Sequence, residues 1–505
     1  MKKQNYSIVF IVLSSLFLSI SIVPANPVPT DVTGFSRITS EPEWYDGMFQ
    51  AKIQTTDQQL IGSINGTIEL GRSDKTGSFT ATWSTDQKTG TVQGRFSHHI
   101  LFGLIKQNNQ AIPFLGKIQG LVNTFSARCY SISSGTYLIN GTYDTSFMYP
   151  LSGPYGIGIK EYHLIDSARP EYFTEENQED KREMMMRIWY PTDAEENDLP
   201  SVDYMDAITF KWLKDRSPIP LITIPKDAYL FVDTHATHSP PLVIDDAPYP
   251  VIMFSHGYDG VYQIYTSLIE DLVSNGYIVA SINHPYIAGV TVFSDDRVVY
   301  VSRIPLDETE RQDWLVMGQR SVIEDIRYGL DVLTDMNNND PMFKNIMDLS
   351  KVGVYGHSFG GGATIACCAK DPRFQAGLTL DGFFTAATIT QGFSTPLCMM
   401  VTGGRYESDT SLPLVWDHLS HQAYLIGITG AEHYSFTDVG VLLDHLLPLI
   451  PAQVLGFGSI NQKRMINITI SLEKAFFDVY LRGKSPEIFI DLLSQYPEIQ
   501  YMMKE

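Results

Sequence analysis

The chain has 505 residues, of which 36 are basic and 57 acidic, so its formal net charge is −21. A charge of this sign repels a phosphate backbone, and nucleic acid is therefore excluded as an expected partner. Hydrophobic residues make up 44% of the chain and charged residues 18%, which supplies ample apolar surface and excludes a disordered or fibrous protein. The four cysteines show no C-x-x-C spacing, so neither a disulfide scaffold nor a metal site is expected. At roughly 150 residues per domain, the length predicts two or three domains.

The amino-terminal residues have the pattern of a secretory signal. Lys2 and Lys3 precede an apolar run of 16 residues from Ile8 to Val23, and a Pro-Ala-Asn-Pro segment follows. A charged start, an apolar run and a small-residue exit predict a signal peptide over residues 1–25 and a secreted mature protein. An uncleaved membrane anchor is the alternative, although the run is shorter than the roughly 20 residues that span a bilayer comfortably.

Residues 31–149 consist of short alternating runs broken by Gly, Asn, Asp and Ser, which predict strands and turns. A pattern Gly-x-apolar-Asn/Gln-Gly recurs at Gly62–Gly66, Gly90–Gly94 and Gly116–Gly120. This spacing predicts successive β-hairpins of one meander, with the glycines at bulges or turns. The role of this β-rich domain is unknown: we interpret it as a structural module, and a carbohydrate- or surface-binding module is the alternative.

From residue 150 to residue 505, apolar strands alternate with helical periods, the pattern of a mostly parallel, doubly wound α/β sheet. A helix is predicted between Trp314 and Met336, where apolar residues follow a helical spacing. Seven short apolar strands are predicted at 185–190, 250–255, 277–282, 352–355, 376–380, 397–401 and 423–428.

The segment Gly356-His357-Ser358-Phe359-Gly360 fits the motif G-x-S-x-G, between an apolar strand and a predicted helix. In this context the motif forms a sharp turn that exposes the serine at the carboxyl edge of the sheet, at the amino end of a helix. We therefore predict Ser358 as a nucleophile, with Gly356, His357 and Gly360 forming the elbow around it.

A serine hydroxyl needs a base to accept its proton, and in this fold the base is a histidine that follows an acid in the chain. His433 comes directly after the strand 423–428 and is the predicted base. His357 and His256 lie inside turns, where structural hydrogen bonding is the expected role. His421 precedes that strand and would lie at its wrong end, and His284 ends another strand and is a candidate wall of the pocket.

Two positions compete for the acid. Asp381 ends the strand 376–380, whereas Glu407 and Asp409 follow the next strand. Spacing alone leaves the choice open. The oxyanion needs two backbone N–H donors, for which we predict Phe359, directly after the nucleophile, and Tyr258 in the loop after strand 250–255, with Gly257 as the alternative.

With these residues in place, the second part of the chain resembles the platelet-activating factor acetylhydrolases and their microbial relatives among the α/β-hydrolases. The matching stretches are MMRIWYP (185–191), YPVIMFSHG (249–257), DLSKVGVYGHSFGG (348–361) and FQAGLTLD (374–381). The resemblance implies an acid at Asp381, a base at His433 and an oxyanion donor at Tyr258. It also implies acyl transfer through a Ser358 acyl-enzyme, with no metal or organic cofactor.

The expected substrate is a short-chain carboxylic ester, with an acetylated phospholipid as one candidate, so contact with a membrane surface or lipid interface belongs to this expectation. The segment Asp203–Lys214 (DYMDAITFKWLK) is interpreted as an interfacial lid or as a surface helix packed on the body. Alternatives are a polyester or cutin hydrolase or a dienelactone-hydrolase-like esterase, which an acid at Glu407 or Asp409 would favour. A surface-binding protein with a dead hydrolase fold is the alternative from another class.

Overall fold

The computed structural model describes residues 46–504 and shows two parts, a β-barrel and a helix-flanked sheet, which are considered separately. The ranges without description inside these limits are 56–59, 71–75, 85–88, 98–99, 108–109, 120–123, 132–134, 144–149, 175–176, 178, 194–200, 217–232, 385–392, 420–421 and 447–451. The predicted signal, residues 1–25, lies outside the described residues, as does His421. No helix in the described part of the chain is long and apolar enough to cross a membrane.

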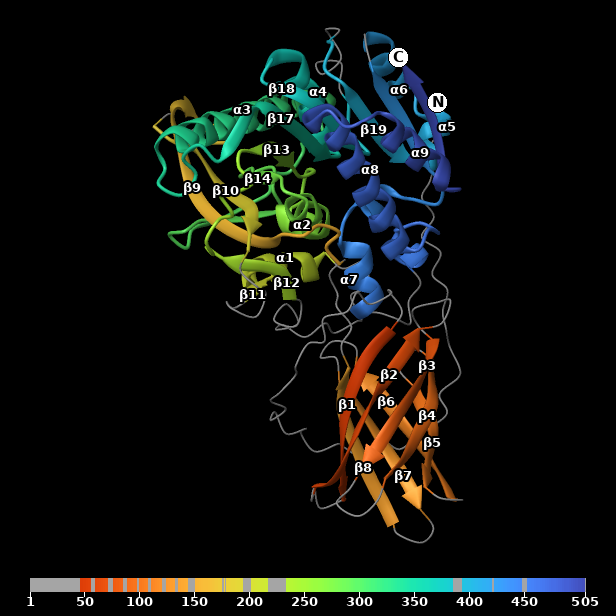
Figure 1. Cartoon of the computed structure of the whole chain (residues 1–505). Coiled ribbons are helices and arrows are strands. Elements are labelled where there is room, and N and C mark those ends of the chain that lie inside the picture. Colours follow the sequence, from red (N-terminus) through yellow and green to blue (C-terminus); the bar gives the residue numbers. More distant parts are fainter. Residues whose placement is uncertain are drawn as a thin grey trace. The chain divides into compact units, whose positions relative to one another are not determined.

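The amino-terminal β-rich part is a closed antiparallel barrel, drawn in red and orange in Figure 1. Each strand pairs with the next along the chain, and the last strand closes the barrel on the first. The strands are β1 (Asp46–Thr55), β2 (Leu60–Leu70), β3 (Thr76–Ser84), β4 (Thr89–Ser97), β5 (Ile100–Gln107), β6 (Gln110–Gln119), β7 (Thr124–Ser131) and β8 (Gly135–Tyr143). Because the barrel is closed, every strand has two neighbours and no edge is left open.

The repeated glycines that the structure describes lie inside strands rather than in turns, Gly62 lies at a register shift between β1 and β2, and Gly120 lies outside the described residues. Gly62 and Gly66 fall in β2, and Gly90 and Gly94 fall in β4, so one repeat corresponds to one hairpin. Gly90 pairs with Trp83 on β3, and a Cβ atom at Gly90 would lie only 2.2 Å from the indole nitrogen. Gly90 therefore leaves room for the Trp83 side chain to pack against β4. Glycine often occurs in sheets where another group must come this close to the backbone.

The second part is built on an eleven-stranded sheet in the order β11-β12-β9-β10-β14-β13-β17-β18-β19-β20-β21. Its strands are β9 (Gly156–Pro170), β10 (Lys181–Thr192), β11 (Ser201–Asp203), β12 (Asp233–His238), β13 (Tyr249–Ser255), β14 (Ile278–Asn283), β17 (Met347–His357), β18 (Phe374–Leu380), β19 (Leu397–Thr402), β20 (Ala423–Ile428) and β21 (Ile499–Lys504). All seven predicted strands are present. The run from β14 to β20 is parallel, whereas β10 pairs antiparallel with β14 and β21 with β20.

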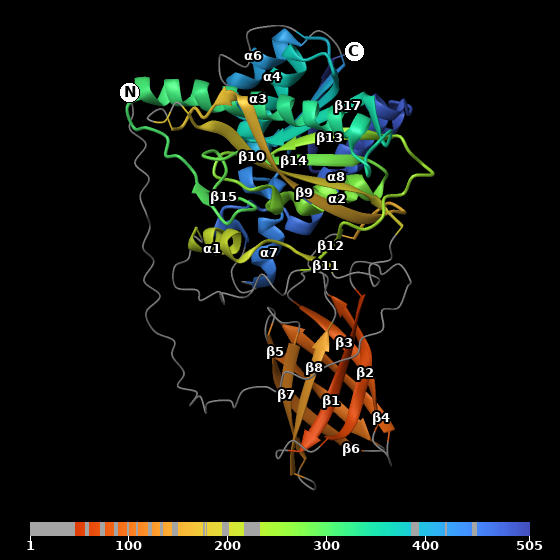
Figure 2. The same ribbon diagram turned by 90° about the vertical axis from the view of Figure 1, so that its left-hand side faces the viewer.

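Helices cover both faces of this sheet. Helix α3 (Glu308–Asn339), which runs along one side of the sheet in Figure 2, packs with α4 (Phe359–Lys370) on one face. Helices α2 (Thr266–Ser274) and α8 (Gln462–Arg482) cover the other face. Successive strand residues alternate between the two cores, so that Met253 packs beneath α3 whereas Phe254 packs beneath α2. This is the layered arrangement of an α/β-hydrolase fold.

The smaller elements lie around these layers. They are α1 (Ala207–Asp215), η3 (Tyr262–Tyr265), β15 (Val290–Val292), β16 (Val298–Tyr300), α5 (Gly403–Ser408), α6 (Ser411–His418), η4 (His433–Phe436), α7 (Val439–Leu446), η5 (Ala452–Leu455) and α9 (Glu487–Gln495). The candidate lid segment contains α1, whose residues Phe210 and Trp212 are buried against the body. The packing favours the surface-helix interpretation of this segment over a mobile lid.

Asp438 is one of several buried carboxylates in the described residues that are incompletely paired. Asp438, between η4 and α7, is 1% exposed, and its Oδ2 accepts hydrogen bonds from Ser267 N and Tyr204 Oη. Its Oδ1 atom has no hydrogen-bond partner among the described residues. Burial raises the pKa of Asp438 to about 7. The folded protein therefore holds a proton here that the unfolded chain loses above about pH 4.

Because of this proton, the free energy of unfolding should depend on pH. Because the folded-state pKa of Asp438 is raised, the carboxyl group destabilises the fold progressively as the pH rises from about 4 to 7. Asp438→Asn should unfold at higher urea concentration than the wild type at pH 8, with a gain on the order of 2–4 kcal/mol. At pH 4 the two proteins should be nearly equal. The variant Asp245→Asn, at an exposed position, controls for the lost charge; an equal gain at both pH values would contradict the assignment.

Candidate active site

Ser358 stands at a strained turn between β17 and α4. Its backbone has φ 53° and ψ −113°, a region that side-chain-bearing residues rarely adopt. The turn is held from both sides, since Ser358 N donates to Leu380 O at 2.9 Å and Phe383 N donates to Ser358 O at 2.7 Å. The geometry is that of a nucleophile elbow, as the motif predicts.

The glycines of the elbow are required by close chain contacts. A Cβ atom at Gly360 would lie 2.2 Å from Ser255 O, and one at Gly356 would lie 2.5 Å from Gly360 O. The first turn of α4 can therefore press against the end of β13 only if these side chains are absent. Within the described residues the Ser358 hydroxyl makes no hydrogen bond, so it is not engaged structurally.

Asp381 and His433 form a direct pair beside this elbow. His433 Nδ1 lies 2.5 Å from Asp381 Oδ2, and the Asp381 side chain is 3% exposed whereas that of His433 is 40% exposed. Burial opposes ionisation of Asp381, but the hydrogen bond with His433 and the charge of Arg405 outweigh it, so the pKa of Asp381 is lowered. The pair thus consists of a buried carboxylate and a partly exposed imidazole.

The competing acids occupy other positions. Asp409 lies at the end of α5, where its carboxylate pairs with Arg405 at 2.7 Å, and Glu407 is exposed. Arg405 Nη1 in turn donates to Asp381 Oδ1 at 3.0 Å. Asp409 is thus three contacts from His433, with Arg405 and Asp381 in between. The structure pairs His433 with Asp381 and with neither alternative.

His357 supports the loop that carries His433. Its Nε2 atom donates to His433 O at 2.9 Å, so its Nδ1 atom accepts from Tyr265 Oη at 2.8 Å. The two imidazole rings are 4.5 Å apart. Burial, together with the nearby His433, lowers the pKa of His357 to about 3, which keeps this ring neutral. The structural role expected for His357 agrees with these contacts.

The two predicted oxyanion donors flank Ser358. Phe359 is the first residue of α4, and its N–H has no intrahelical partner. Across the elbow, a Cβ atom at Gly257 would lie 3.0 Å from Ser358 Cβ, so the loop after β13 runs close to the serine. The N–H of the next residue, Tyr258, has no acceptor within the described part of the chain. Neither N–H group is thus engaged within the described part of the chain.

Aromatic packing joins the two donors. The Trp314 ring lies 5.3 Å from the ring of Tyr258 and 6.1 Å from that of Phe359. Asp259, which follows Tyr258 and has φ 54°, accepts hydrogen bonds from Trp212 and Arg216 at the end of α1. The loop is therefore fixed on both sides of Tyr258.

Two histidines next to this loop are fully buried. His256 donates from Nδ1 to Gly257 O at 2.8 Å, which agrees with a structural role. His284 is 0% exposed and bonds to Asp325, so its interpretation as a pocket wall is wrong: the ring turns into the protein, toward a buried charge.

Sequence reasoning missed several supporting residues. Arg405 contacts Asp381, Tyr265 contacts His357 and Asp325 contacts His284, and the two residues of each pair are more than twenty positions apart. The only signal was for Arg405, which stands in the glycine-rich segment directly after β19, at the active edge of the sheet.

Comparison with known proteins gives a consistent result. The family model described as "Platelet-activating factor acetylhydrolase, isoform II" matches residues 141–485, a range that excludes nearly all of the barrel. The chain is 25% identical over 334 residues to a platelet-activating factor acetylhydrolase of Cavia porcellus, covering 59% of this chain and 72% of the relative. It is 23% identical over 274 residues to a probable 1-alkyl-2-acetylglycerophosphocholine esterase of Arthroderma benhamiae, covering 51% and 67%.

Among solved structures, a ferulic acid esterase from Streptomyces cinnamoneus aligns with a TM-score of 0.58 and 25% identity. The alignment covers 70% of this chain and 98% of that structure. Relatives and structural neighbour alike are ester hydrolases, and the fold is the one expected from the sequence. The chain is a carboxylic ester hydrolase and belongs to the platelet-activating factor acetylhydrolase, isoform II, family.

Proposed function

We propose that this esterase acts through a triad of Ser358, His433 and Asp381 and cleaves short-chain carboxylic esters, with acetylated phospholipids as the favoured class. The observation that carries the proposal is the 2.5 Å contact between His433 Nδ1 and Asp381 Oδ2, beside a serine in a strained elbow. The names of the two relatives, an acetylhydrolase and an acetylglycerophosphocholine esterase, support the substrate class.

In the first half-reaction, the Ser358 hydroxyl attacks the ester carbonyl while His433 Nε2 accepts its proton. Asp381 accepts the Nδ1–H of His433 and stabilises the imidazolium that forms. The N–H groups of Phe359 and Tyr258 donate to the oxyanion of the tetrahedral intermediate. His433 then protonates the leaving alcohol, and the acyl group stays on Ser358.

In the second half-reaction, water takes the place of the alcohol. His433 accepts a proton from water as the oxygen attacks the acyl carbonyl, and it returns that proton to Ser358 as the acid leaves. Since the Ser358 hydroxyl makes no hydrogen bond in the described residues, a small movement of serine or histidine must precede proton transfer. Catalytic hydrogen bonds are often long in enzymes without substrate and tighten on binding.

The pairing also bears on the alternatives. A polyester, cutin or dienelactone-type hydrolase was expected to keep its acid after the next strand, yet Asp409 there is engaged by Arg405. A dead surface-binding protein would have no need of an oriented Asp381–His433 pair. We further propose that the amino-terminal segment exports the enzyme, in keeping with its charged and apolar pattern.

The acid assignment predicts a large difference between two matched substitutions. Asp381→Asn removes the acceptor that fixes the His433 tautomer and should lower kcat on a short-chain nitrophenyl ester on the order of 10⁴-fold. Asp409→Asn acts only through Arg405 and should lower kcat less than about 10-fold. The exposed Glu407→Gln is the control and should match the wild type. A larger loss in Asp409→Asn than in Asp381→Asn would move the acid to the other strand.

The nucleophile and the substrate class are tested together on the full chain. A fluorophosphonate probe should label the wild type, label Ser408→Ala equally, and fail to label Ser358→Ala. Ser408 is an exposed serine on α5 and serves as the control. In an acyl-chain series that includes an acetylated phospholipid, kcat/KM should be highest for the acetyl ester. A folded wild type that does not label would refute the enzyme mechanism, and a maximum at long acyl chains would refute the substrate class.

A further inference from the structure

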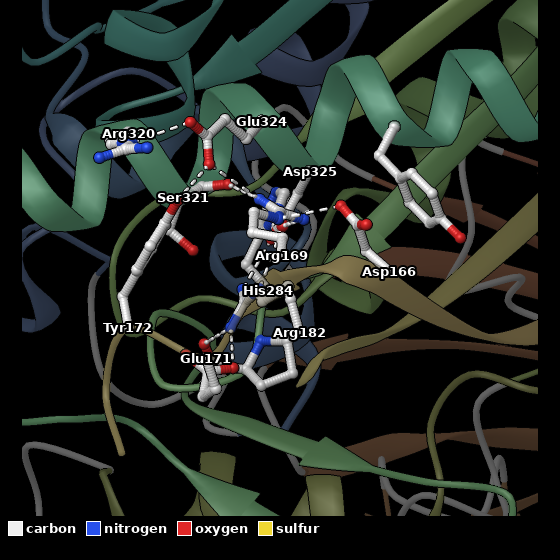
Figure 3. Close-up of polar contacts among 12 residues, drawn as sticks. Asp166, Arg169, Glu171, Tyr172, Arg182, His284, Arg320, Ser321, Glu324 and Asp325 are labelled. Carbon is white, nitrogen blue, oxygen red and sulfur yellow. Dashed lines mark hydrogen bonds and ion pairs between the residues drawn. The ribbon is translucent and has the colours of Figure 1, made fainter. Parts of the chain in front are cut away.

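A buried cluster of charges lies next to the loop that carries Tyr258. Figure 3 shows Asp325, on α3, beside Arg169 at the end of β9 and Arg182 on β10. Asp325 accepts hydrogen bonds from Arg169 Nη2 at 2.5 Å and from Arg182 Nη2 at 2.6 Å. Arg182, itself 0% exposed, also donates to Glu171 Oε2 at 2.8 Å. Two buried cations thus face two carboxylates, and the catalytic proposal uses none of them.

Further groups surround this cluster. Arg169 also contacts Asp166 and Glu324, and Glu324 is held by Arg320 and Tyr172. These outer residues lie toward the surface, whereas Asp325 is 0% exposed. The charges hold Asp325 ionised: burial opposes ionisation, but Arg182, His284 and Arg169 outweigh it and keep the pKa of Asp325 well below its usual range.

His284 is the group that links this cluster to the active-site loop. It directly follows β14, and its Nδ1 lies 2.9 Å from Asp325 Oδ2. Since a carboxylate only accepts, Nδ1 carries the hydrogen, and Nε2 accepts from Ser255 Oγ at 3.0 Å. Ser255, His284 and Asp325 have the connectivity of a catalytic triad, but all three are 0% exposed, so no substrate reaches this serine.

A second contact continues from His284 to the loop. The backbone N–H of His284 donates to His256 Nε2 at 3.3 Å, the His284 ring packs against the His256 ring with centroids 5.1 Å apart, and His256 Nδ1 donates to Gly257 O at 2.8 Å. Gly260 N donates to the same carbonyl at 3.0 Å. The Gly257 carbonyl and the Tyr258 N–H belong to one planar peptide and point in opposite directions. Fixing the carbonyl therefore fixes the direction of the Tyr258 N–H.

We propose that His284, oriented by Asp325, is a positioning residue that aims the Tyr258 N–H at the oxyanion. This inference rests on the proposed function, because it assumes Tyr258 as a donor to the intermediate. This role explains why the buried side chain that follows β14 and contacts the end of β13 is an imidazole. An apolar side chain could fill the same space but would form no hydrogen bonds. The Arg169 and Arg182 pairs keep Asp325 ionised and hold the imidazole in one orientation.

The test compares variants of residues that take part in the contacts from Asp325 to Gly257 with a variant of a residue that does not. His284→Phe keeps every ion pair of the cluster but removes the ring hydrogen bonds to Asp325 and Ser255. We expect kcat to fall about 10- to 100-fold with KM changed less than about 2-fold, because a misdirected oxyanion donor affects the transition state selectively. The affinity for a trifluoromethyl ketone, which forms a tetrahedral adduct, should fall by a similar factor. Ser255→Ala, a milder change, should lower both quantities in the same direction.

Asp325→Asn and Asp371→Asn form a matched pair. Asp371 is also a buried carboxylate, held by Arg327 of α3 at 3.0 Å and Arg373 at 2.7 Å, but it makes none of the contacts to residues 256–260. Both substitutions should lower the melting temperature, and only Asp325→Asn should also lower kcat and the inhibitor affinity. His284→Phe keeps the test decisive if Asp325→Asn does not fold.

Two results would overturn the proposal. The first is a folded His284→Phe protein with wild-type kcat and inhibitor affinity, and the second is an equal loss of kcat in Asp371→Asn. Fluorophosphonate labelling of the wild type is measured first. If Ser358 does not label, the proposed function fails, and the oxyanion role of Tyr258 fails with it. If Ser358 labels normally but kcat and inhibitor affinity are unchanged in the variants, only the positioning role of His284 is refuted.

Discussion

The contact between His433 and Asp381 is the interaction on which the site depends. The two residues are 52 positions apart in the chain and follow two strands, β20 and β18, that are separated by β19 in the sheet. Because these strands are parallel, their carboxyl ends meet at one edge of the sheet, where β17 also delivers Ser358. Arg405 contacts Asp381 from outside the pair, His357 donates to the carbonyl of His433, and Tyr265 holds His357 in turn.

Rigidity at this edge comes from backbone geometry as much as from side chains. Ser358 and Asp381 both have positive φ angles, 53° and 45°, which are costly for residues with a Cβ atom. Ser358 N donates to Leu380 O at the end of β18, and Phe383 N in the loop after β18 donates to Ser358 O, so the two strained turns support each other. The surrounding sheet, buried on both faces, provides the stability that such turns require.

The sequence predicts this architecture well where the signal is local. The seven strands and the sharp turn at Ser358 were predicted from short apolar runs and one motif, since buried parallel strands read as continuous apolar segments. Spacing left the choice of acid open, because Asp381 and Asp409 both follow strands that end at the same edge. Only the family resemblance favoured Asp381 before the structure paired it with His433.

Features that depend on distant pairing escaped prediction. The Asp325 cluster joins β9, β10, β14 and α3, and its members are up to 156 residues apart, so no window of sequence contains it. The barrel glycines were expected at bulges or turns because glycine is common there, whereas Gly90 lies inside a strand and accommodates Trp83. Glycine can form a turn or can leave room for a side chain on the neighbouring strand, and the register between the strands decides which of the two it does.

In the mechanism that we propose, Ser358 carries the acyl group between the two half-reactions. The most direct measurement is rapid quenching of the wild type with a short-chain nitrophenyl ester, followed by peptide mass mapping. We expect a burst of nitrophenol and an acyl group on the peptide that contains Ser358. In Ser358→Ala we expect no burst and no acylated peptide. An acyl group found on another residue, or turnover that persists in Ser358→Ala, would contradict this mechanism.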